Sequence, residues 1–153
     1  MTATGPSIVS INRSDGGIPK TPQATAAVTL AGIAGDEHDH EKHYRPEQAI
    51  CMFDVEMLVQ LRAEGYDLAP GTIGENLTVT NLDVQNVAIG SLLEIDGGVV
   101  LEVTKRRKPC YVLDSIDPTL KDAIRDRCGT YARVLTPGTI DAGAAITVVR
   151  PAP

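Results

Sequence analysis

The chain has 153 residues, of which 20 are acidic and 14 are basic, so its formal net charge is −6. Hydrophobic residues make up 42% and charged residues 22% of the sequence, proportions that are typical of a globular domain and exclude a disordered or fibrous protein. An acidic chain with four Tyr, one Phe and no Trp also lacks the basic surface and the stacking aromatics on which nucleic-acid binding depends.

Short runs rich in β-branched residues, separated by turn residues, predict a compact sheet or barrel. The glycines of Asp96-Gly97-Gly98 predict a tight hairpin, because glycine readily adopts positive φ. Pro137-Gly138 is a second turn signal, placed in a longer connection between the last two strands, and indicates a second hairpin there. The expected strands are residues 7–11, 27–31, 77–80, 92–95, 99–104, 132–135 and 146–149.

Two segments are expected to be helical. Apolar residues recur every three or four positions over residues 47–64, with Pro46 before the segment and Gly65 after it, which predicts one amphipathic helix packed on the sheet. A second, shorter helix is predicted over residues 118–127, with Asp117 as its N-cap. No repeat or linker divides the chain, so we expect residues 1–153 to form one domain with a core at about residues 8–149.

The N-terminal sequence and the cysteines indicate the cellular compartment in which the protein resides. Residues 1–17 have no basic start followed by an apolar run, so no secretory signal is predicted. The longest uncharged stretch, residues 21–35, is shorter than the roughly 20 residues that a membrane span needs. Three widely spaced cysteines indicate free thiols in a reducing compartment. We therefore expect a cytoplasmic protein that does not bind membranes.

All three histidines, His38, His40 and His43, lie close together between a predicted strand and the predicted first helix. Imidazole and carboxylate groups are usual ligands of Zn²⁺, Fe²⁺ and Ni²⁺, so the cluster is a candidate metal site. A polar surface loop explains it equally well, because the spacing by itself is not a zinc signature. Both interpretations stay open at this stage.

Residues 70–79 place Gly71 and Gly74 just before a predicted strand, with Glu75 and Asn76 where the turn becomes the strand. Glycine lets a ligand approach the backbone closely. Glu75 is then a candidate general acid or base, metal ligand or partner of a cation. The alternative is that Glu75 and Asn76 only satisfy hydrogen bonds of the turn.

Four consecutive cations, residues 105–108, precede Pro109 and Cys110. Nearby cations favour thiolate over thiol, and thiolate is both a nucleophile and a ligand of soft metals. Cys110 is therefore the best candidate nucleophile or metal ligand, although such cations are usually solvated and a single cysteine is often a small buried residue. We expect structural roles for Cys51, in the first predicted helix, and for Cys128, at the end of the second.

Several segments follow one another in an order that resembles a known family, the MOSC domain (molybdenum-cofactor sulfurase C-terminal domain). The resemblance covers about residues 8–149, and its Gly-Glu-Asn-Leu and Pro-Cys elements are specific at their relative spacing. The matching segments are residues 16–20, 32–38, 45–46, 70–79, 101–104, 108–110, 131–135 and 137–138.

The resemblance implies a β-rich α+β fold, a MOSC-type β-barrel with peripheral helices. It also implies a cysteine that binds the molybdenum of a pterin cofactor or carries sulfur, and this cysteine falls on Cys110. The family's other motif positions are thereby brought around one pocket. They fall on Gly35, Asp36, His38, Arg45, Pro46, Gly74, Glu75, Asn76 and Leu77.

The first functional hypothesis is therefore a molybdenum-pterin or persulfide protein that acts through Cys110 on a small nitrogen- or sulfur-containing substrate. Arg45, Arg107 and Lys108 would hold the anionic phosphate or substrate, beside Gly74 and Asp36. Glu75 and Asn76 would orient the substrate or move a proton. A separate reductase or sulfurase protein would be the partner.

Two further hypotheses use the same fold. His38, His40 or His43, in a run denser in histidine than the family pattern, would hold a divalent metal with Glu75, as in a metal-dependent lyase or hydrolase. In the other, the protein is a non-catalytic carrier that delivers sulfur or the cofactor to a partner, with a transferable persulfide on Cys110.

Overall fold

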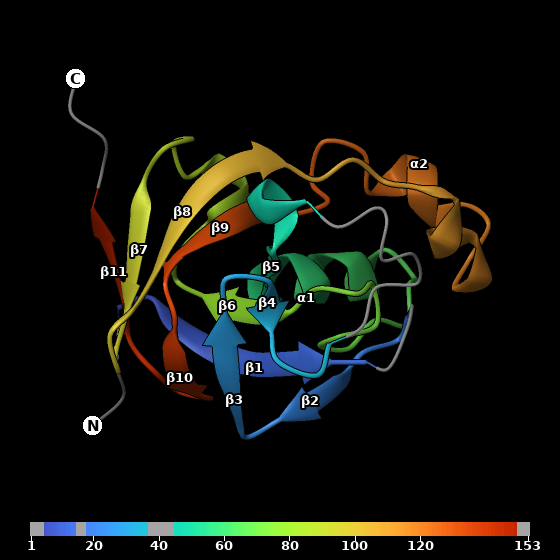
Figure 1. Cartoon of the computed structure of the whole chain (residues 1–153). Helices are drawn as coiled ribbons and strands as arrows, with labels where there is room; N and C mark the ends of the chain where they lie inside the picture. Colours follow the sequence, from blue (N-terminus) through green and yellow to red (C-terminus); the bar gives the residue numbers. More distant parts are fainter. Residues whose placement is uncertain (1–4, 15–17, 37–44, 150–153) are drawn as a thin grey trace.

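The structure is a computed structural model and describes residues 5–14, 18–36 and 45–149. Its main element is an eight-stranded sheet with the order β11-β7-β8-β9-β5-β6-β1-β2, next to a three-stranded sheet with the order β10-β3-β4 (Figure 1). The strands are β1 (Ser7–Arg13), β2 (Thr21–Gln23), β3 (Thr25–Thr29), β4 (Gly32–Ile33), β5 (Ile50–Asp54), β6 (Leu77–Thr80), β7 (Leu92–Ile95), β8 (Val99–Arg106), β9 (Thr130–Thr136), β10 (Gly138–Asp141) and β11 (Ile146–Val149).

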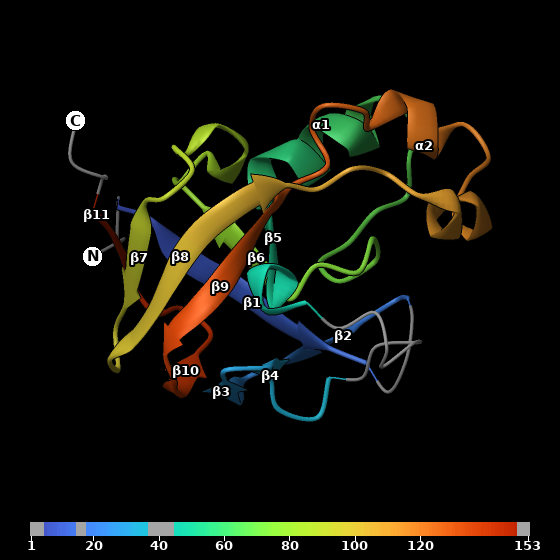
Figure 2. The same cartoon turned by 45° about the horizontal axis from the view of Figure 1, so that its top comes forward.

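Helices are short and lie outside the sheets. The helical segments are η2 (Pro46–Gln48), α1 (Val55–Ala63), η3 (Val84–Asn86), η4 (Tyr111–Ser115) and α2 (Leu120–Ala123). Figure 2 shows the chain leaving the end of β8 toward η4 and α2, with α1 on the same side of the sheet. None of the helices in the described part of the chain has the length and apolar character needed to cross a bilayer.

The large sheet curls, so that the start of β1 meets the segment that leads into β11. The Ile8 N–H donates to the Ala144 carbonyl and the Ile146 N–H donates to the Pro6 carbonyl, both at 2.9 Å. In β8 alternate residues fill the interior, where Val99, Leu101 and Val103 are buried. The prediction of a β-rich, barrel-like fold with peripheral helices is confirmed.

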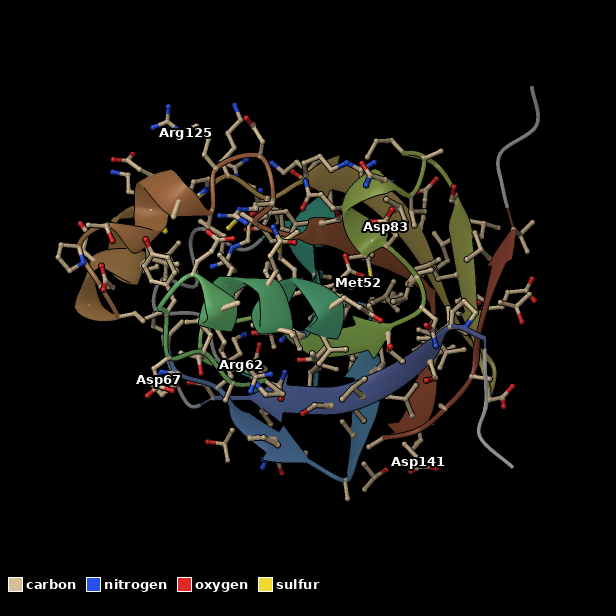
Figure 3. All side chains as sticks on the ribbon, turned by 180° about the vertical axis from the view of Figure 1, so that it is seen from behind. Met52, Arg62, Asp67, Asp83, Arg125 and Asp141 are labelled. Atoms are coloured by element: carbon tan, nitrogen blue, oxygen red, sulfur yellow. The ribbon has the colours of Figure 1, made fainter. Side chains whose placement is uncertain are left out.

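The predicted helix over residues 47–64 is wrong in its first half, which forms β5, and only α1 is helical. All five residues of β5 are buried. Met52 belongs to the core inside the curled sheet, and Phe53 to a second core under α1. A strand covered on both faces is apolar at nearly every position, so its pattern does not distinguish it from a buried helix. Figure 3 shows α1 lying across the back of the sheet.

Two other expectations need correction. The second helix is shorter than residues 118–127: only α2 is helical, and its N-cap is Thr119, whose N–H donates to Asp117 Oδ1 at 2.8 Å. The last two predicted strands do not pair with each other. β9 pairs with β5 and β8, whereas β11 pairs with β7, because the intervening residues form a strand of their own, β10, in the small sheet. The hairpin around residues 96–98 is confirmed.

Candidate functional site

Three adjoining hollows meet at the end of β8, and we name them by position. The inner pocket, of about 140 Å³, is lined by Lys20, Arg45, Gln48, Cys51, Gly74, Asn76, Arg107 and Tyr131. The α2 hollow, of about 530 Å³, is lined by Gln85, Arg106, Arg107, Lys108, Pro109, Lys121, Arg125 and Asp126. The β8 hollow, of about 560 Å³, is lined by Gln48, Lys105, Arg106, Lys108 and Tyr131. Shared wall residues connect all three hollows.

Strand register brings the wall together from distant parts of the sequence. Tyr131 on β9 pairs with Cys51 on β5 and with Lys105 on β8. Beyond β8 the Arg107 N–H donates to the Gly129 carbonyl at 2.9 Å, so the cationic run continues along the start of β9. The sheet therefore delivers a row of cations to one edge of the barrel.

Arg107 is buried, with 9% of its surface exposed, unlike an ordinary solvated cation. Its Nη2 donates to the Ile73 carbonyl at 2.8 Å, and its Nη1 lies 3.9 Å from the Cys51 sulfur. Within the described residues no carboxylate oxygen lies within 4.0 Å of this guanidinium. A positive charge that has no carboxylate partner among the described residues therefore stands in the wall between the inner pocket and the α2 hollow.

Cys51 lines the inner pocket, which the sequence did not predict. Its backbone N–H donates to Asn76 Oδ1 at 2.9 Å, and the Asn76 N–H donates to the Cys51 carbonyl at 2.8 Å. Burial raises the pKa of the thiol, and Arg107 offsets this only in part, so the thiol stays neutral at physiological pH. The sequence also did not predict Tyr131 as a pocket residue. Only the pairing of β5 with β9 places Tyr131 beside Cys51 at the inner pocket.

Asp36 connects three residues around the inner pocket. Its Oδ2 accepts Lys20 Nζ at 2.6 Å and Asn76 Nδ2 at 2.9 Å, and its Oδ1 accepts the Ser14 N–H at 2.9 Å. The side chain is only 4% exposed. In the structure Asp36 therefore positions Lys20 and Asn76, which line the pocket, and is itself absent from the lining.

Glu75 lies behind the pocket, although its neighbours Gly74 and Asn76 line it. Its side chain is fully buried, and its Oε2 accepts the Thr78 hydroxyl at 2.9 Å. Among the described residues nothing hydrogen-bonds to its Oε1. Burial raises the pKa of Glu75 above that of an exposed carboxyl group. The predicted contact of Glu75 with substrate stays a prediction.

Cys110 is exposed and follows Pro109, which lines the α2 hollow; Cys110 itself is not among the lining residues. Cys128 is buried in the core under α1. The structure therefore places the two predicted site elements differently: the Pro-Cys element borders the α2 hollow, whereas the Gly-Glu-Asn element borders the inner pocket.

The histidine loop, with His38, His40 and His43, lies outside the described residues. In the parts of the chain that are described, no group of three or more His, Cys, Asp or Glu side chains could hold a metal ion. The divalent-metal hypothesis therefore stays a prediction.

We expect iodoacetamide to alkylate Cys110 well before the other two cysteines at pH 8. Cys110 is exposed, whereas burial raises the pKa of Cys128 to about 11 and also raises that of Cys51. A thiol with that pKa is only about 0.1% thiolate at pH 8, and thiolate is the reacting form. Peptide mass spectrometry over a time course checks this expectation. Equal labelling of the three in folded protein would contradict it, and labelling in urea serves as the control.

Comparison with known proteins decides the family. A sequence model of the MOSC domain matches residues 39–147. The chain belongs to the MOSC domain family. The matched stretch contains Arg45, the Gly74–Asn76 motif and Cys110, whereas Asp36 and His38 precede it.

Relatives of this MOSC domain include longer proteins. A protein from Gibberella moniliformis named "Reductase" is 37% identical over 136 residues, which is 82% of this chain and 24% of that protein. YflK of Bacillus subtilis, described as uncharacterized, is 32% identical over 135 residues, 84% of this chain and 61% of that protein. The chain thus spans about a quarter and about three fifths of the lengths of these relatives.

The fold of this MOSC domain is also found in solved structures. The crystal structure of YiiM from Geobacillus stearothermophilus superposes with a TM-score of 0.79 at 30% sequence identity. The superposition covers 95% of this chain and 75% of YiiM. The barrel-like fold described above is therefore shared with a solved relative.

Proposed function

We propose that this MOSC domain binds a molybdenum-pterin cofactor across the α2 and β8 hollows, with Cys110 as the thiolate ligand of the metal or as the carrier of a sulfur atom. The observation that carries this proposal is an exposed cysteine that directly follows Pro109 in the wall of the α2 hollow, next to two connected hollows lined mainly by cations, in a chain whose net charge is −6.

The size and charge of the hollows fit such a group. Each of the two larger hollows falls within the roughly 300–1,000 Å³ that cofactor sites occupy, whereas the inner pocket is too small for a fused ring system. Lys105 and Lys108 are exposed and are not ion-paired within the described residues, so both are free to hold a phosphate. Asp126 is the one carboxylate among the lining residues of these two hollows.

Arg106 is already committed to the protein. Its Nη1 donates to the Val84 carbonyl at 3.1 Å and to the Thr130 hydroxyl at 3.0 Å, and its Nη2 donates to the Val87 carbonyl. This arrangement fixes the guanidinium in the wall, where it contributes charge without moving. Lys105 and Lys108, on either side of Arg106 and Arg107, are the cations left to adapt to a ligand.

When bound, the molybdenum would supply two-electron redox chemistry at the mouth of the hollows. The chain's own residues would bind the anionic end of the cofactor, and the exposed Cys110 sulfur would be the ligand that the chain gives to the metal. A small nitrogen- or sulfur-containing substrate, with electrons from a separate protein, is consistent with the relative named "Reductase". The same thiolate could instead carry sulfur as a persulfide.

Metal analysis of protein purified from a host that makes the cofactor tests the proposal. We expect molybdenum in near-stoichiometric amount in the wild-type protein and its loss in Cys110→Ser. Cys128→Ser, at a buried thiol far from solvent, is the matched control and should keep the metal. Wild-type protein without molybdenum or pterin would contradict the cofactor function. Cyanide-releasable sulfur on Cys110 in the absence of molybdenum would favour the sulfur carrier.

Charge reversal at the hollows tests where the cofactor binds. Lys108→Glu should lower the molybdenum content severalfold, because Lys108 lines both larger hollows. Arg62→Glu on α1 changes the total charge equally but lies outside the lining of the hollows, at the back of the molecule (Figure 3), so it should leave the content unchanged. Equal losses in the two variants would instead indicate an effect of overall charge.

A further inference from the structure

We propose that Glu64 and Arg127 are positioning residues for Cys110, because their ion pair holds the segment that carries this cysteine against the end of helix α1. The inference rests on the proposed function, in which Cys110 is the ligand of the metal or the carrier of sulfur. The segment is residues 108–128, which we call the β8–β9 segment. It leaves the large sheet after β8 and returns to it at β9 (Figure 2).

Cys110 lies on a short bridge between the barrel and the rest of the β8–β9 segment. At the base of the segment the Arg107 N–H donates to the Gly129 carbonyl at 2.9 Å. Within the described chain, residues 108–109 make no backbone hydrogen bond to the barrel. The Cys110 carbonyl instead accepts the Leu113 N–H at 3.1 Å, at the start of η4. The position of Cys110 therefore depends on where η4 is held.

The β8–β9 segment is packed on the core under α1. Its fully buried apolar side chains all belong to that core, and no described residue of the segment belongs to the core inside the barrel. These side chains are Leu113, Leu120, Ile124 and Cys128. The α2 hollow thus lies between two packed units, with Arg106 on the barrel side and Lys121 and Arg125 on the segment. A shift of the segment along α1 would change both the hollow and the place of Cys110.

Two polar contacts hold the β8–β9 segment to the end of α1. Arg127 Nη1 donates to Glu64 Oε2 at 2.7 Å, and Arg127 Nη2 donates to Glu64 Oε1 at 2.6 Å. The Nε of Arg127 also donates to the Ala123 carbonyl at 2.8 Å, so the same guanidinium fastens α2 to the returning chain. The second contact joins the hydroxyls of Tyr66 and Thr119 at 2.8 Å.

The Glu64–Arg127 pair differs from an ordinary surface ion pair, which contributes little. Its geometry is bidentate, and the Arg127 side chain is only 22% exposed. Hydrogen bonds from Arg127 lower the pKa of Glu64, so the carboxylate stays charged at neutral pH. The same segment also contains a pair of the ordinary kind, Arg125 with Asp122, which makes one contact at 3.0 Å between side chains that are 66% and 81% exposed.

A nitroxide spin label on Cys110 tests the positioning role in cofactor-free protein. A methanethiosulfonate reagent labels this exposed thiol in the folded protein, whereas Cys51 and Cys128 are buried. We expect Glu64→Ala to narrow the EPR lines of the label, because the bridge becomes more mobile. Amide hydrogen exchange in η4 and α2 should become faster by about threefold or more. Asp122→Ala, which breaks the ordinary pair, is the matched control and should change neither measurement.

Restoring the pair with reversed charges distinguishes positioning from a general loss of stability. Glu64→Arg and Arg127→Glu should each make the label more mobile, and the double variant Glu64→Arg/Arg127→Glu should recover part of the loss. Tyr66→Phe removes one hydroxyl and no charge, so it should shift the spectrum in the same direction by a smaller amount. Coincident spectra of wild type and Glu64→Ala, or an equal change in Asp122→Ala, would overturn the proposal.

Metal analysis separates this inference from the proposed function. If both hold, Glu64→Ala should contain less molybdenum than the wild type, by about threefold or more, while Asp122→Ala keeps the wild-type content. If the wild type lacks molybdenum but the label responds as described, the cofactor function fails and the positioning role stands. If Glu64→Ala keeps both the molybdenum content and the label spectrum of the wild type, only the positioning role fails.

Discussion

Gly129→Ala should lower the free energy of unfolding by more than about 4 kcal/mol, an exceptional loss for one substitution, because it combines a steric conflict in a packed region with a strained backbone. Gly129 has φ +99, and a Cβ there would lie 2.4 Å from the Met52 carbonyl oxygen and 3.1 Å from Phe53 Cδ2. The carbonyl cannot move away, because β5 is paired with β6 on one side and β9 on the other. The substitution should also displace Arg107, whose N–H donates to the Gly129 carbonyl.

Gly143→Ala separates the steric conflict from the backbone strain. Gly143 has φ +93, close to that of Gly129, but a Cβ there would meet nothing within 4 Å. Alanine at Gly143 should therefore cost only the strain of a positive φ, about 1–2 kcal/mol. Urea unfolding followed by circular dichroism compares the two variants. Equal losses of unfolding free energy in the two variants would show that the close approach of Gly129 to the Met52 carbonyl adds no steric cost.

Asp54→Asn should stabilise the protein at neutral pH, by up to about 3 kcal/mol at pH 7.5. Asp54 is 6% exposed and accepts the Val84 N–H at 2.9 Å and the Gln85 N–H at 3.4 Å. These hydrogen bonds join β5 to η3, the short helix that follows Asp83, which is labelled in Figure 3. Burial raises its pKa from 3.8 to about 6. Asparagine keeps an acceptor for the Val84 N–H without the buried charge.

The effect of this substitution should depend on pH in a defined direction. An acid whose pKa is raised by folding binds its proton more tightly in the folded state, so its ionisation destabilises the fold. For Asp54 this penalty is complete above about pH 6 and absent below about pH 3.8. The advantage of Asp54→Asn should therefore be nearly constant above about pH 6 and should shrink between about pH 6 and pH 3.8.

Urea unfolding at several pH values measures this dependence. Asp67→Asn removes one exposed carboxylate and controls for the change in total charge. An advantage of Asp54→Asn that is constant with pH, or an outright destabilisation at pH 7.5, would mean that the charged form is well accommodated. Because Gln85 also lines the α2 hollow, cofactor binding by the same variant reports whether η3 affects the site.

Much of the sheet was predictable because its information is local. Residues 77–80, 92–95 and 146–149 are strands with the expected bounds, and Gly97 and Gly98 have the positive φ that the hairpin requires. Period-two alternation and turn glycines act within a few residues, so they can be read without the rest of the chain. The strand β5 was misread because both of its faces are covered by parts of the chain remote in sequence.

In the candidate site, too, some features follow from the local sequence and others depend on contacts between distant segments. Cys110 is exposed beside a cationic hollow, in keeping with the run of charges before it. The roles of Arg107 and Cys51 could not be read from their neighbours. Arg107 is bonded to the carbonyl of Ile73 and lies against the Cys51 sulfur, contacts that span 34 and 56 residues of sequence.

The sequence by itself determined a strand-rich domain of the MOSC family, the turn at residues 96–98 and the cationic run beside Cys110. These follow from composition, short-range periodicity and motif order. Only the tertiary structure decided which cation of the run is buried and which cysteine lines the inner pocket. Burial and charge compensation depend on which distant segments pack together. Arg107 thus became a buried charge without a carboxylate partner in the described chain, while its neighbour Lys108 stayed in solvent.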